Sequence, residues 1–352
     1  MDKTKLFKLW LKNKDISDEA YAFLSGNEIQ TKSNVQGFGE KKISVNISTH
    51  NRPKALIRLL ESIRMQLYSN YEIIIIDDKS TDNTGIVINK YIDENPQLDI
   101  KYYVNKENLG VSESKKRGYK RCTGDIIIFS DDDDYFIDYL YFNKINKIYN
   151  DNQDCIMTTA STLYHYEKDD SYALKKINFD FPLENDKYLK GFAVKYIKPG
   201  SMFTLSLNAK KMREIEYQDL ICFNDMSLYL YAALANGKVY PIVEAVGIYS
   251  VQIFSMTSGV SAEYTINNLD AKIDIGNKAL KCGFLTVKQQ KLWNYEQCMP
   301  TLLNFFNGKI KSLKEIMCVN IWMIKNLNFT YFINALGQEA KARIIYHVKE
   351  KK

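Results

Sequence analysis

The sequence predicts an α/β protein in which an open, mostly parallel sheet is flanked by helices and followed by a helical C-terminal extension. Two observations lead to this fold class. Between residues 43 and 129, four strand-like apolar runs alternate with three segments of helical periodicity, which is typical of right-handed β-α-β crossovers. Two of the runs, 73–76 (IIII) and 126–129 (IIIF), are apolar at every position, as expected of strands covered on both faces.

Local patterns place each element of the first half. Strands are expected where β-branched and aromatic residues cluster, at 43–47, 72–76, 101–104 and 126–129. Helices are expected between them, at 53–67, 84–94 and 112–120. The first helix shows the periodicity most clearly, because its apolar residues recur on one helical face: Leu56, Leu59, Leu60 and Ile63.

The pattern is looser outside this region. Residues 1–41 predict one or two short helices. Beyond residue 150, strand-like segments are expected at 156–159, 201–207 and 239–241, a helix near 226–235, and helices from about 267 to the end. We therefore predict three parts: an N-terminal helical extension (1–41), a central domain (42–265) and a basic helical C-terminal region (266–352).

The composition is that of an ordinary globular protein, with 45% hydrophobic and 26% charged residues among 352. No apolar run reaches the length of about 18 residues that a membrane-spanning helix needs. The N-terminal residues lack the apolar core of a secretion signal. The six cysteines are scattered without a Cys-x-x-Cys pair, which favours reduced thiols. We therefore expect a cytoplasmic protein.

The net charge of +6 is unevenly distributed, because the residues from Ile275 onward contain 13 Lys and Arg against four Glu. A basic C-terminal region suggests an anionic neighbour, and we expect a membrane surface at its inner face or a partner subunit rather than nucleic acid. A solvated helical face explains the charge equally well. The aromatic and Lys-rich stretch 293–325 is open to three interpretations: a core-packing helical subdomain, an interfacial amphipathic surface, or a glycan- or peptide-binding cap.

Carboxylates gather where the predicted strands end. Strand one is followed by Ser48–Asn51, strand two by Asp77 and Asp78, and strand four by Asp131–Asp134. Ligands of open α/β sheets bind beyond these carboxyl ends. Carboxylates brought this close together repel one another. A hard divalent cation such as Mg²⁺ relieves the repulsion, and Mg²⁺ usually binds one or two carboxylates together with substrate phosphates. No P-loop and no G-x-G-x-x-G is present, so the pattern indicates a nucleoside diphosphate bound through a metal.

Three segments in this order, VNISTHNRPKALIRLLESI, EIIIIDDKSTDNT and NLGVSESKKRGYKRCTGDIIIFSDDDD, resemble the bacterial-type GT-A fold glycosyltransferases of family 2. The resemblance covers about residues 42–255. It implies the Rossmann-like GT-A sheet, with a nucleotide-binding half at about 42–135 and an acceptor half at about 136–265. It also implies a nucleotide-sugar donor and Mn²⁺ or Mg²⁺ as cofactor.

Residues that match the family's motifs take their expected roles from the resemblance. Ser48 and Asn51 would lie in the loop that packs on the nucleotide, and Asp78 would accept a hydrogen bond from the pyrimidine ring. Lys115 would lie near the nucleotide, where the family usually has Arg. Asp131, Asp132 and Asp133 match the Asp-x-Asp motif: Asp131 and Asp132 would belong to the donor site, with Asp131 on the ribose or a metal-bound water, and Asp133 would ligate the metal.

Two further positions depend on the same resemblance. The segment CFNDMSLYLY matches the start of the family's catalytic helix, which makes Asp225 the expected general base, preceded by Asn224 where the family has Glu. Family members often have a late histidine as a metal ligand. Here Gln252 stands near that position, and we expect it to complete the metal site.

The resulting prediction is a metal-dependent, inverting glycosyltransferase that moves a sugar, most simply from UDP-sugar, to a hydroxyl of a glycan, lipid-linked saccharide or polymer. Two alternatives stay open: a nucleotidyltransferase on a similar sheet, and a catalytically idle GT-A domain that serves as a binding subunit. Locally, Asp77 and Asp78 could only cap a turn, Asp131–Asp134 could hold a structural Ca²⁺ ion, and Asp225 could only cap its helix.

Overall fold

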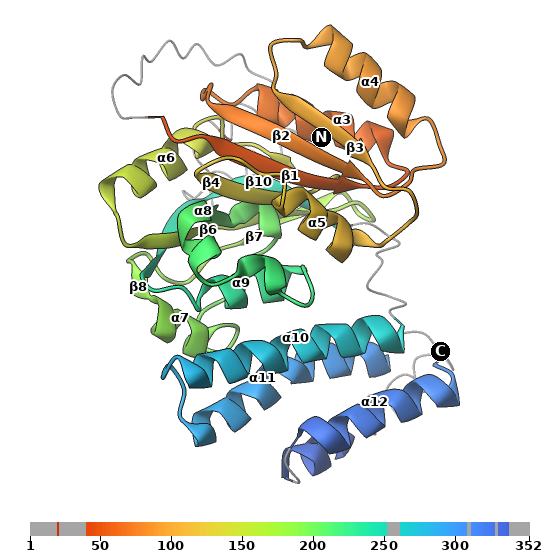
Figure 1. Cartoon of the computed structure of the whole chain (residues 1–352), viewed down its shortest axis with the longest axis vertical. Helices are drawn as coiled ribbons and strands as arrows, with labels where there is room; N and C mark the ends of the chain where they lie inside the picture. The colour runs from red at the N-terminus through yellow and green to blue at the C-terminus, as the bar shows by residue number, and fades with distance from the viewer. Residues whose placement is uncertain (1–19, 21–39, 252–260, 308–310, 328–329, 338–352) are drawn as a thin grey trace.

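The computed structural model describes residues 20, 40–251, 261–307, 311–327 and 330–337. One mixed sheet forms its centre, with helices on both faces (Figure 1). Four parallel strands occupy one side in the order β3-β2-β1-β4: β1 (Ile43–Thr49), β2 (Tyr71–Asp77), β3 (Ile100–Val104) and β4 (Ile126–Asp131). The predicted α/β class with an open, mostly parallel first half is therefore confirmed.

The other side of the sheet contains the second half of the chain. The order continues β9-β6-β10-β5, with β9 (Ser206–Asn208) antiparallel to both neighbours and β10 (Lys238–Val251) parallel to β6 (Cys155–Tyr166). Three short strands complete the sheet: β5 (Tyr135–Phe136), β7 (Ser171–Lys175) and β8 (Leu183–Glu184). The sheet is thus continuous across the predicted nucleotide and acceptor halves.

Alternation along the strands explains how the sheet is covered. In β4, Ile126 and Ile128 contribute to one hydrophobic core and Ile127 and Phe129 to the other, because successive side chains point to opposite faces. The first core contains side chains of α3 (Pro53–Arg64), α4 (Thr84–Glu94) and α6 (Tyr141–Asp151). On the other face lie α5 (Val111–Tyr119), α7 (Asn185–Gly191), α8 (Ala209–Glu214) and α9 (Asp225–Ala232).

Most predicted elements of the first half are confirmed within three residues, but the strands predicted further along are wrong in extent. Strand β6 has 12 residues where only 156–159 were expected. The segment 201–207 is not a strand: Met202–Thr204 form a 3₁₀ turn, and only Ser206–Asn208 pair in the sheet. Thr204 Oγ1 donates to the Ser201 carbonyl oxygen (2.7 Å), a local bond that favours a turn. Strand β10 has 14 residues where three were expected, because register shifts interrupt its alternation.

The C-terminal region is helical, as predicted, with α10 (Ala262–Lys281), α11 (Val287–Asn307) and α12 (Leu313–Asn326). Ile275 and Trp293 from α10 and α11 belong to the same core as Leu228 of α9. Trp293 Nε1 also donates to the Leu189 carbonyl oxygen (2.8 Å). The core-packing interpretation of the stretch 293–325 therefore holds for the part that lies in α11. The predicted extension at 1–41 lies outside the described residues, apart from residues 20, 40 and 41.

Helix α12 presents an apolar stripe to solvent. Its buried side contains Val319, Trp322 and Met323, whereas its exposed large apolar residues follow at helical spacing: Leu313, Met317, Ile321 and Ile324.

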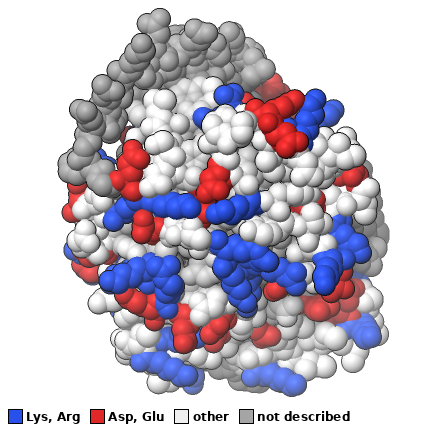
Figure 2. Space-filling model, turned by 45° about the horizontal axis from the view of Figure 1, so that its top comes forward, with Lys and Arg blue, Asp and Glu red and all other residues white. Residues whose placement is uncertain are grey.

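Across the face in Figure 2, basic side chains predominate in the middle but acidic ones lie among them. None of the helices in the described part of the chain has the length and hydropathy needed to cross a bilayer. A membrane or subunit contact through the basic C-terminal region stays a prediction.

Gly118 is required where α5 crosses β1. A Cβ atom at this position would lie 1.9 Å from Asn46 Oδ1, and the Asn46 amide donates to the Lys115 carbonyl oxygen (2.8 Å). Gly118→Ala is expected to lower the free energy of unfolding by about 1–3 kcal/mol, the usual cost of overpacking, measured by urea denaturation. Gly85→Ala is the matched control: its Cβ would meet only Tyr102 Oη at 3.5 Å, and it should be neutral or stabilising. Equal stability of both variants would contradict the argument.

Candidate active site

The carboxyl ends of β1, β2 and β4 meet at one edge of the sheet, which we name the acidic edge (Ser48–Arg52, Asp77–Asp78 and Asp131–Asp134). The parallel register places Ser48 beside Asp131 and Thr49 beside Asp77. Thr49 Oγ1 donates to Asp132 Oδ2 (2.7 Å). The predicted convergence of these loops is therefore present.

Ser48 and Asn51 have different surroundings within this edge. Ser48 is buried, and its hydroxyl has no hydrogen-bond partner among the described residues. Asn51 adopts a left-handed backbone conformation (φ 55°), which Asn tolerates better than most residues. Its side-chain oxygen accepts from the backbone N–H of Thr81 (2.7 Å) and of Asp82 (3.3 Å). Asn51 thus holds the loop after β2 against the loop after β1.

Asp78 organises the loop between β3 and α5. Its buried carboxylate accepts from Asn105 Nδ2 (2.9 Å), from the Leu109 N–H (2.8 Å) and from the Gly110 N–H (2.7 Å). A carboxylate offers about four acceptor positions, so room for one further donor is left. The turn-capping role falls instead to Asp77, whose Oδ1 accepts from the Ser80 N–H (2.6 Å).

Lys115 forms an ion pair with Asp131. Its ammonium group lies 2.8 Å from Asp131 Oδ1, and the side chain of Lys115 is only 3% exposed whereas that of Asp131 is 30% exposed. An ammonium group has three donors, so Lys115 can contact a second anion while it keeps Asp131. The two predicted site residues are therefore brought together by α5 and β4.

Arg52 is a site residue that the sequence analysis missed. Its Nη1 lies 2.7 Å from Asp133 Oδ2 and 3.2 Å from Asp132 Oδ1. Arg58 adds a bond from Nη2 to the Asp133 carbonyl oxygen (2.6 Å). The sequence did contain a signal for this role of Arg52: it is a basic residue directly after the strand-one loop, next to Pro53 at the start of α3. Protein cations therefore relieve part of the carboxylate repulsion that we assigned to a metal alone.

The four consecutive aspartates are not equivalent. Burial raises the pKa of Asp132 to about 6, although Arg52 and Thr49 oppose the shift. Burial, together with Asp131, also raises the pKa of Asp133. Asp134 is completely buried and accepts from Ser201 Oγ (2.6 Å); burial and the charges of Asp131 and Asp133 hold its pKa well above the usual value. Asp131 and Asp133 are thus the more accessible carboxylates.

The raised pKa of Asp132 predicts a pH-dependent cost to stability. Because its pKa is about 6 in the folded protein and about 4 in an unfolded chain, folding favours the protonated form, and stability from this group falls as pH rises from 4 to 6. Asp132→Asn is therefore expected to raise the free energy of unfolding at pH 7.5 by on the order of 1–2 kcal/mol. Denaturation at pH 7.5 and pH 4 tests this, and a gain of equal size at both values would contradict it.

Asp225 begins α9, but it is not the cap of that helix. The cap is Asn224, whose side-chain oxygen accepts from the Ser227 N–H (3.0 Å). The partly exposed Asp225 carboxylate forms no hydrogen bond or ion pair with any residue in the described ranges. Its charge contributes to the raised pKa values of Asp134, Tyr164 and Tyr249, after burial, so the carboxylate lies near the Asp134 end of the acidic edge.

The acidic edge suits a divalent metal that shares its ligands with a substrate. No group of three His, Cys, Asp or Glu side chains in the described residues forms a complete metal cage. The donors present at the surface, Asp131 and Asp133, are oxygen ligands, and Mg²⁺ commonly takes one or two carboxylates plus phosphate oxygens. The residues therefore fit such an ion. Gln252, the other predicted ligand, lies outside the described residues.

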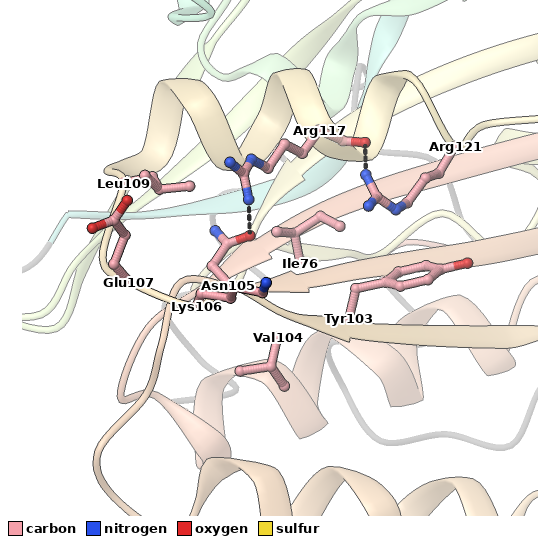
Figure 3. A pocket seen from close by; sticks show the side chains of 9 residues that line it. All are labelled: Ile76, Tyr103, Val104, Asn105, Lys106, Glu107, Leu109, Arg117 and Arg121. Atoms are coloured by element: carbon pink, nitrogen blue, oxygen red, sulfur yellow. Dashed lines mark hydrogen bonds between the residues drawn. The ribbon is translucent and has the colours of Figure 1, made fainter.

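A pocket of about 460 Å³ lies between the β3 edge and α5, next to the loop that Asp78 holds. Figure 3 shows the two arginines that line it, Arg117 from α5 and Arg121 from the turn after that helix. Arg117 Nη1 donates to Asn105 Oδ1 (3.2 Å), and the Arg121 guanidinium lies 4.7 Å from the centre of the Tyr103 ring. Asn105 connects this pocket to Asp78, but none of the predicted site residues lines it.

The chain is similar in sequence to known glycosyltransferases over parts of its length. Residues 44–235 match the family model Glycosyl transferase family 2. The uncharacterized glycosyltransferase YwdF of Bacillus subtilis is 32% identical over 195 residues, which are 54% of this chain and 68% of that protein. The GalNAc(5)-diNAcBac-PP-undecaprenol beta-1,3-glucosyltransferase of Campylobacter jejuni is 36% identical over 97 residues, only 26% of this chain and 30% of that protein.

A solved structure shares most of the fold. The crystal structure of Staphylococcus aureus TarS 1–349 in complex with UDP-GlcNAc superposes with a TM-score of 0.65 at 17% sequence identity, covering 88% of this chain and 92% of TarS 1–349. At this identity the likeness shows the GT-A fold, including the helical C-terminal region, and nothing finer. Together with the family match over more than half of the chain, it shows that the protein belongs to glycosyl transferase family 2.

Proposed function

We propose that this protein is a metal-dependent, inverting glycosyltransferase that transfers a sugar from a nucleoside diphosphate donor, UDP-sugar, to a hydroxyl of a glycan, a lipid-linked saccharide or a polymer. The observation that carries the proposal is Asp225: a carboxylate without a bonded partner in the described structure faces an edge where Asp131 and Asp133 are accessible. The presence of UDP-GlcNAc and of UDP in crystal structures of TarS supports the choice of donor.

The donor would lie across the acidic edge. The acceptor position left on Asp78 suits the N–H of a uracil ring, because a carboxylate binds such a donor well. Lys115 and Arg52 would meet the diphosphate, and Asp133 with Asp131 would hold Mn²⁺ or Mg²⁺. When bound, the metal would neutralise charge on the departing diphosphate. Arg52 lies 2.7 Å from Asp133, so donor binding would draw Arg52 from the carboxylate toward phosphate.

The acceptor would approach from the side of Asp225. A cavity of about 190 Å³ lies beside Met226, the next residue. Its lining combines apolar and aromatic groups, among them Tyr264, with hydroxyl and amide side chains such as Thr265 and Asn268. Such a lining suits a polyhydroxylated molecule. Asp225 would remove the proton of the attacking hydroxyl while its oxygen bonds to the anomeric carbon, and the diphosphate would leave from the opposite face of the sugar.

Calorimetric titration with UDP, GDP, CDP and TDP, each with Mn²⁺ and again with EDTA, tests the donor site. The expected result is binding of UDP that requires the metal and is unchanged in Asp93→Asn, an exposed carboxylate on α4. Failure of all four nucleotides to bind would overturn the proposal. Binding of UDP-sugar without turnover, across many acceptors, would favour the idle binding subunit instead.

A further inference from the structure

Two lysines from different segments meet beside the catalytic helix. Lys175 ends β7 and pairs with Thr162 of β6. Gly200 lies directly against Thr162, because a Cβ atom at Gly200 would be 2.6 Å from Thr162 Cβ. Tyr164 Oη donates to the Gly200 carbonyl oxygen (2.9 Å). The loop that contains Lys198 and Gly200 therefore packs on the β6 residue beside Lys175, and the charge of Lys198 acts on Lys175.

The same loop connects the lysines to Asp225. Tyr229 Oη donates to the Ser201 carbonyl oxygen (3.0 Å), and Asp225 lies four residues before Tyr229 in α9, on the same helical face. The carboxylate of Asp225 is also among the charges that act on Lys175. The two lysines, Ser201 and the proposed base thus lie on one side of the acidic edge.

Neither lysine is neutralised by a bonded carboxylate. In the described part of the chain, Lys175 and Lys198 form no ion pair with Asp or Glu. The nearest recorded partner of Lys175 is Tyr164, whose hydroxyl is 3.5 Å and whose ring centre is 5.4 Å from the ammonium nitrogen. Burial, and then the charge of Lys198, lowers the pKa of Lys175. A half-buried pair of like charges costs free energy that a bound anion would recover.

A third lysine, Lys272, adds positive charge near Lys198. Lys272 of α10 is completely buried and donates to Thr301 Oγ1, a residue that lines the cavity beside Met226. Burial lowers its pKa to about 8, and the charge of Lys198 contributes to the shift. The carboxylate whose charge acts on Lys175 is that of Asp225, and in the proposed reaction this carboxylate is needed for proton transfer.

We propose that Lys175 and Lys198 form a subsite for a phosphate ester group of the acceptor, next to the hydroxyl that Asp225 activates. Tyr164 and Tyr249, whose ring centres are 4.9 Å apart, form the aromatic wall on which the carbon chain or sugar ring between phosphate and hydroxyl lies. This inference rests on the proposed function and narrows its acceptor class from any hydroxylated molecule to a phosphorylated one.

The test measures binding of matched small probes to protein that is already saturated with UDP and Mn²⁺, so that the donor diphosphate site is filled. Three probes are compared: glycerophosphoglycerol (a phosphodiester), glycerol 3-phosphate (a phosphate monoester) and diglycerol (uncharged). One or both phosphate esters should bind at least about tenfold more tightly than diglycerol, since a hydrogen bond to a charged group contributes about 1.5–3 kcal/mol. Which ester binds more tightly distinguishes a chain-internal phosphate from a terminal one.

Variants assign the binding to the two lysines. Lys175→Gln with Lys198→Gln should remove the preference for phosphate, whereas the double arginine variant should keep it, which excludes misfolding as the cause. Lys90→Gln, a lysine on the exposed side of α4, is the control for loss of charge. Equal binding of charged and uncharged probes, or a preference that survives in the double glutamine variant, would overturn the subsite. Loss of UDP binding by the wild type would instead overturn the proposed function.

Discussion

Asp225→Asn is expected to reduce the rate of sugar transfer by about 10²–10⁴-fold, the contribution of a positioned general base, while UDP binds as tightly as in the wild type. An amide has the shape of the carboxylate but cannot take up the acceptor's proton. Because Asp225 has no bonded partner in the described structure, its replacement breaks no hydrogen bond or ion pair recorded there. Product formation from UDP-sugar and calorimetry with UDP and Mn²⁺ measure the two effects.

Asn224→Ala is the matched control for that experiment. It removes the cap that accepts from the Ser227 N–H and should lower the free energy of unfolding by about 1 kcal/mol, but it leaves the carboxylate of Asp225 in place. Transfer at near wild-type rate in Asn224→Ala, together with its loss in Asp225→Asn, separates proton removal from the integrity of the helix start. Full activity of Asp225→Asn would show that another group is the base.

Asp133→Asn is expected to weaken metal-dependent binding of UDP by at least about tenfold, because a carboxylate ligand is replaced by a neutral amide. Asp133 has the position this role requires: it is held by Arg52 at 2.7 Å and its side chain is 17% exposed. Calorimetric titration with UDP and Mn²⁺, repeated with EDTA, measures the change. Affinity without metal should be the same in both proteins.

Asp134→Asn provides the comparison within the same loop. Asp134 is completely buried and bonded to Ser201, and an amide oxygen can accept that bond. Since its raised pKa favours the neutral acid, the substitution changes little charge and should leave metal-dependent UDP binding within about threefold. If Asp134→Asn lost metal-dependent UDP binding and Asp133→Asn did not, Asp134 and not Asp133 would be the metal ligand.

The parallel half of the fold was predictable because its signals are local. Runs such as 73–76 and 126–129 are apolar at every position and favour buried strands. The helices between them, for example Thr84–Glu94, show helical periodicity. Strand ends follow from strand positions, so the convergence of Ser48, Asp78 and Asp131 could be inferred before their contacts were known. The match to family 2 confirms the resemblance on which the role of Asp225 was based.

What could not be predicted depends on contacts between distant segments. The bond of Asp78 to Leu109 and the pairing of Arg52 with Asp133 join residues 31 and 81 positions apart, and no local pattern shows which residue the partner would be. The length of β10 was missed because its register shifts interrupt the period of two. The lysine pair was missed because β7 and the loop at Lys198 are separate in sequence and are related through β6 residues such as Thr162 and Tyr164.

The core that contains Phe129 and Leu228 also contains Ile275 and Trp293, and this sets an order of events during synthesis. Domains generally fold as units, beginning with the N-terminal part while the ribosome is still translating. Here the sheet can form early, but the face that holds α9 is covered only when residues up to Trp293 have left the exit tunnel. Until then the nascent chain exposes apolar surface on this face of the sheet, so α9 is fully packed only after α10 and the first half of α11 have been made.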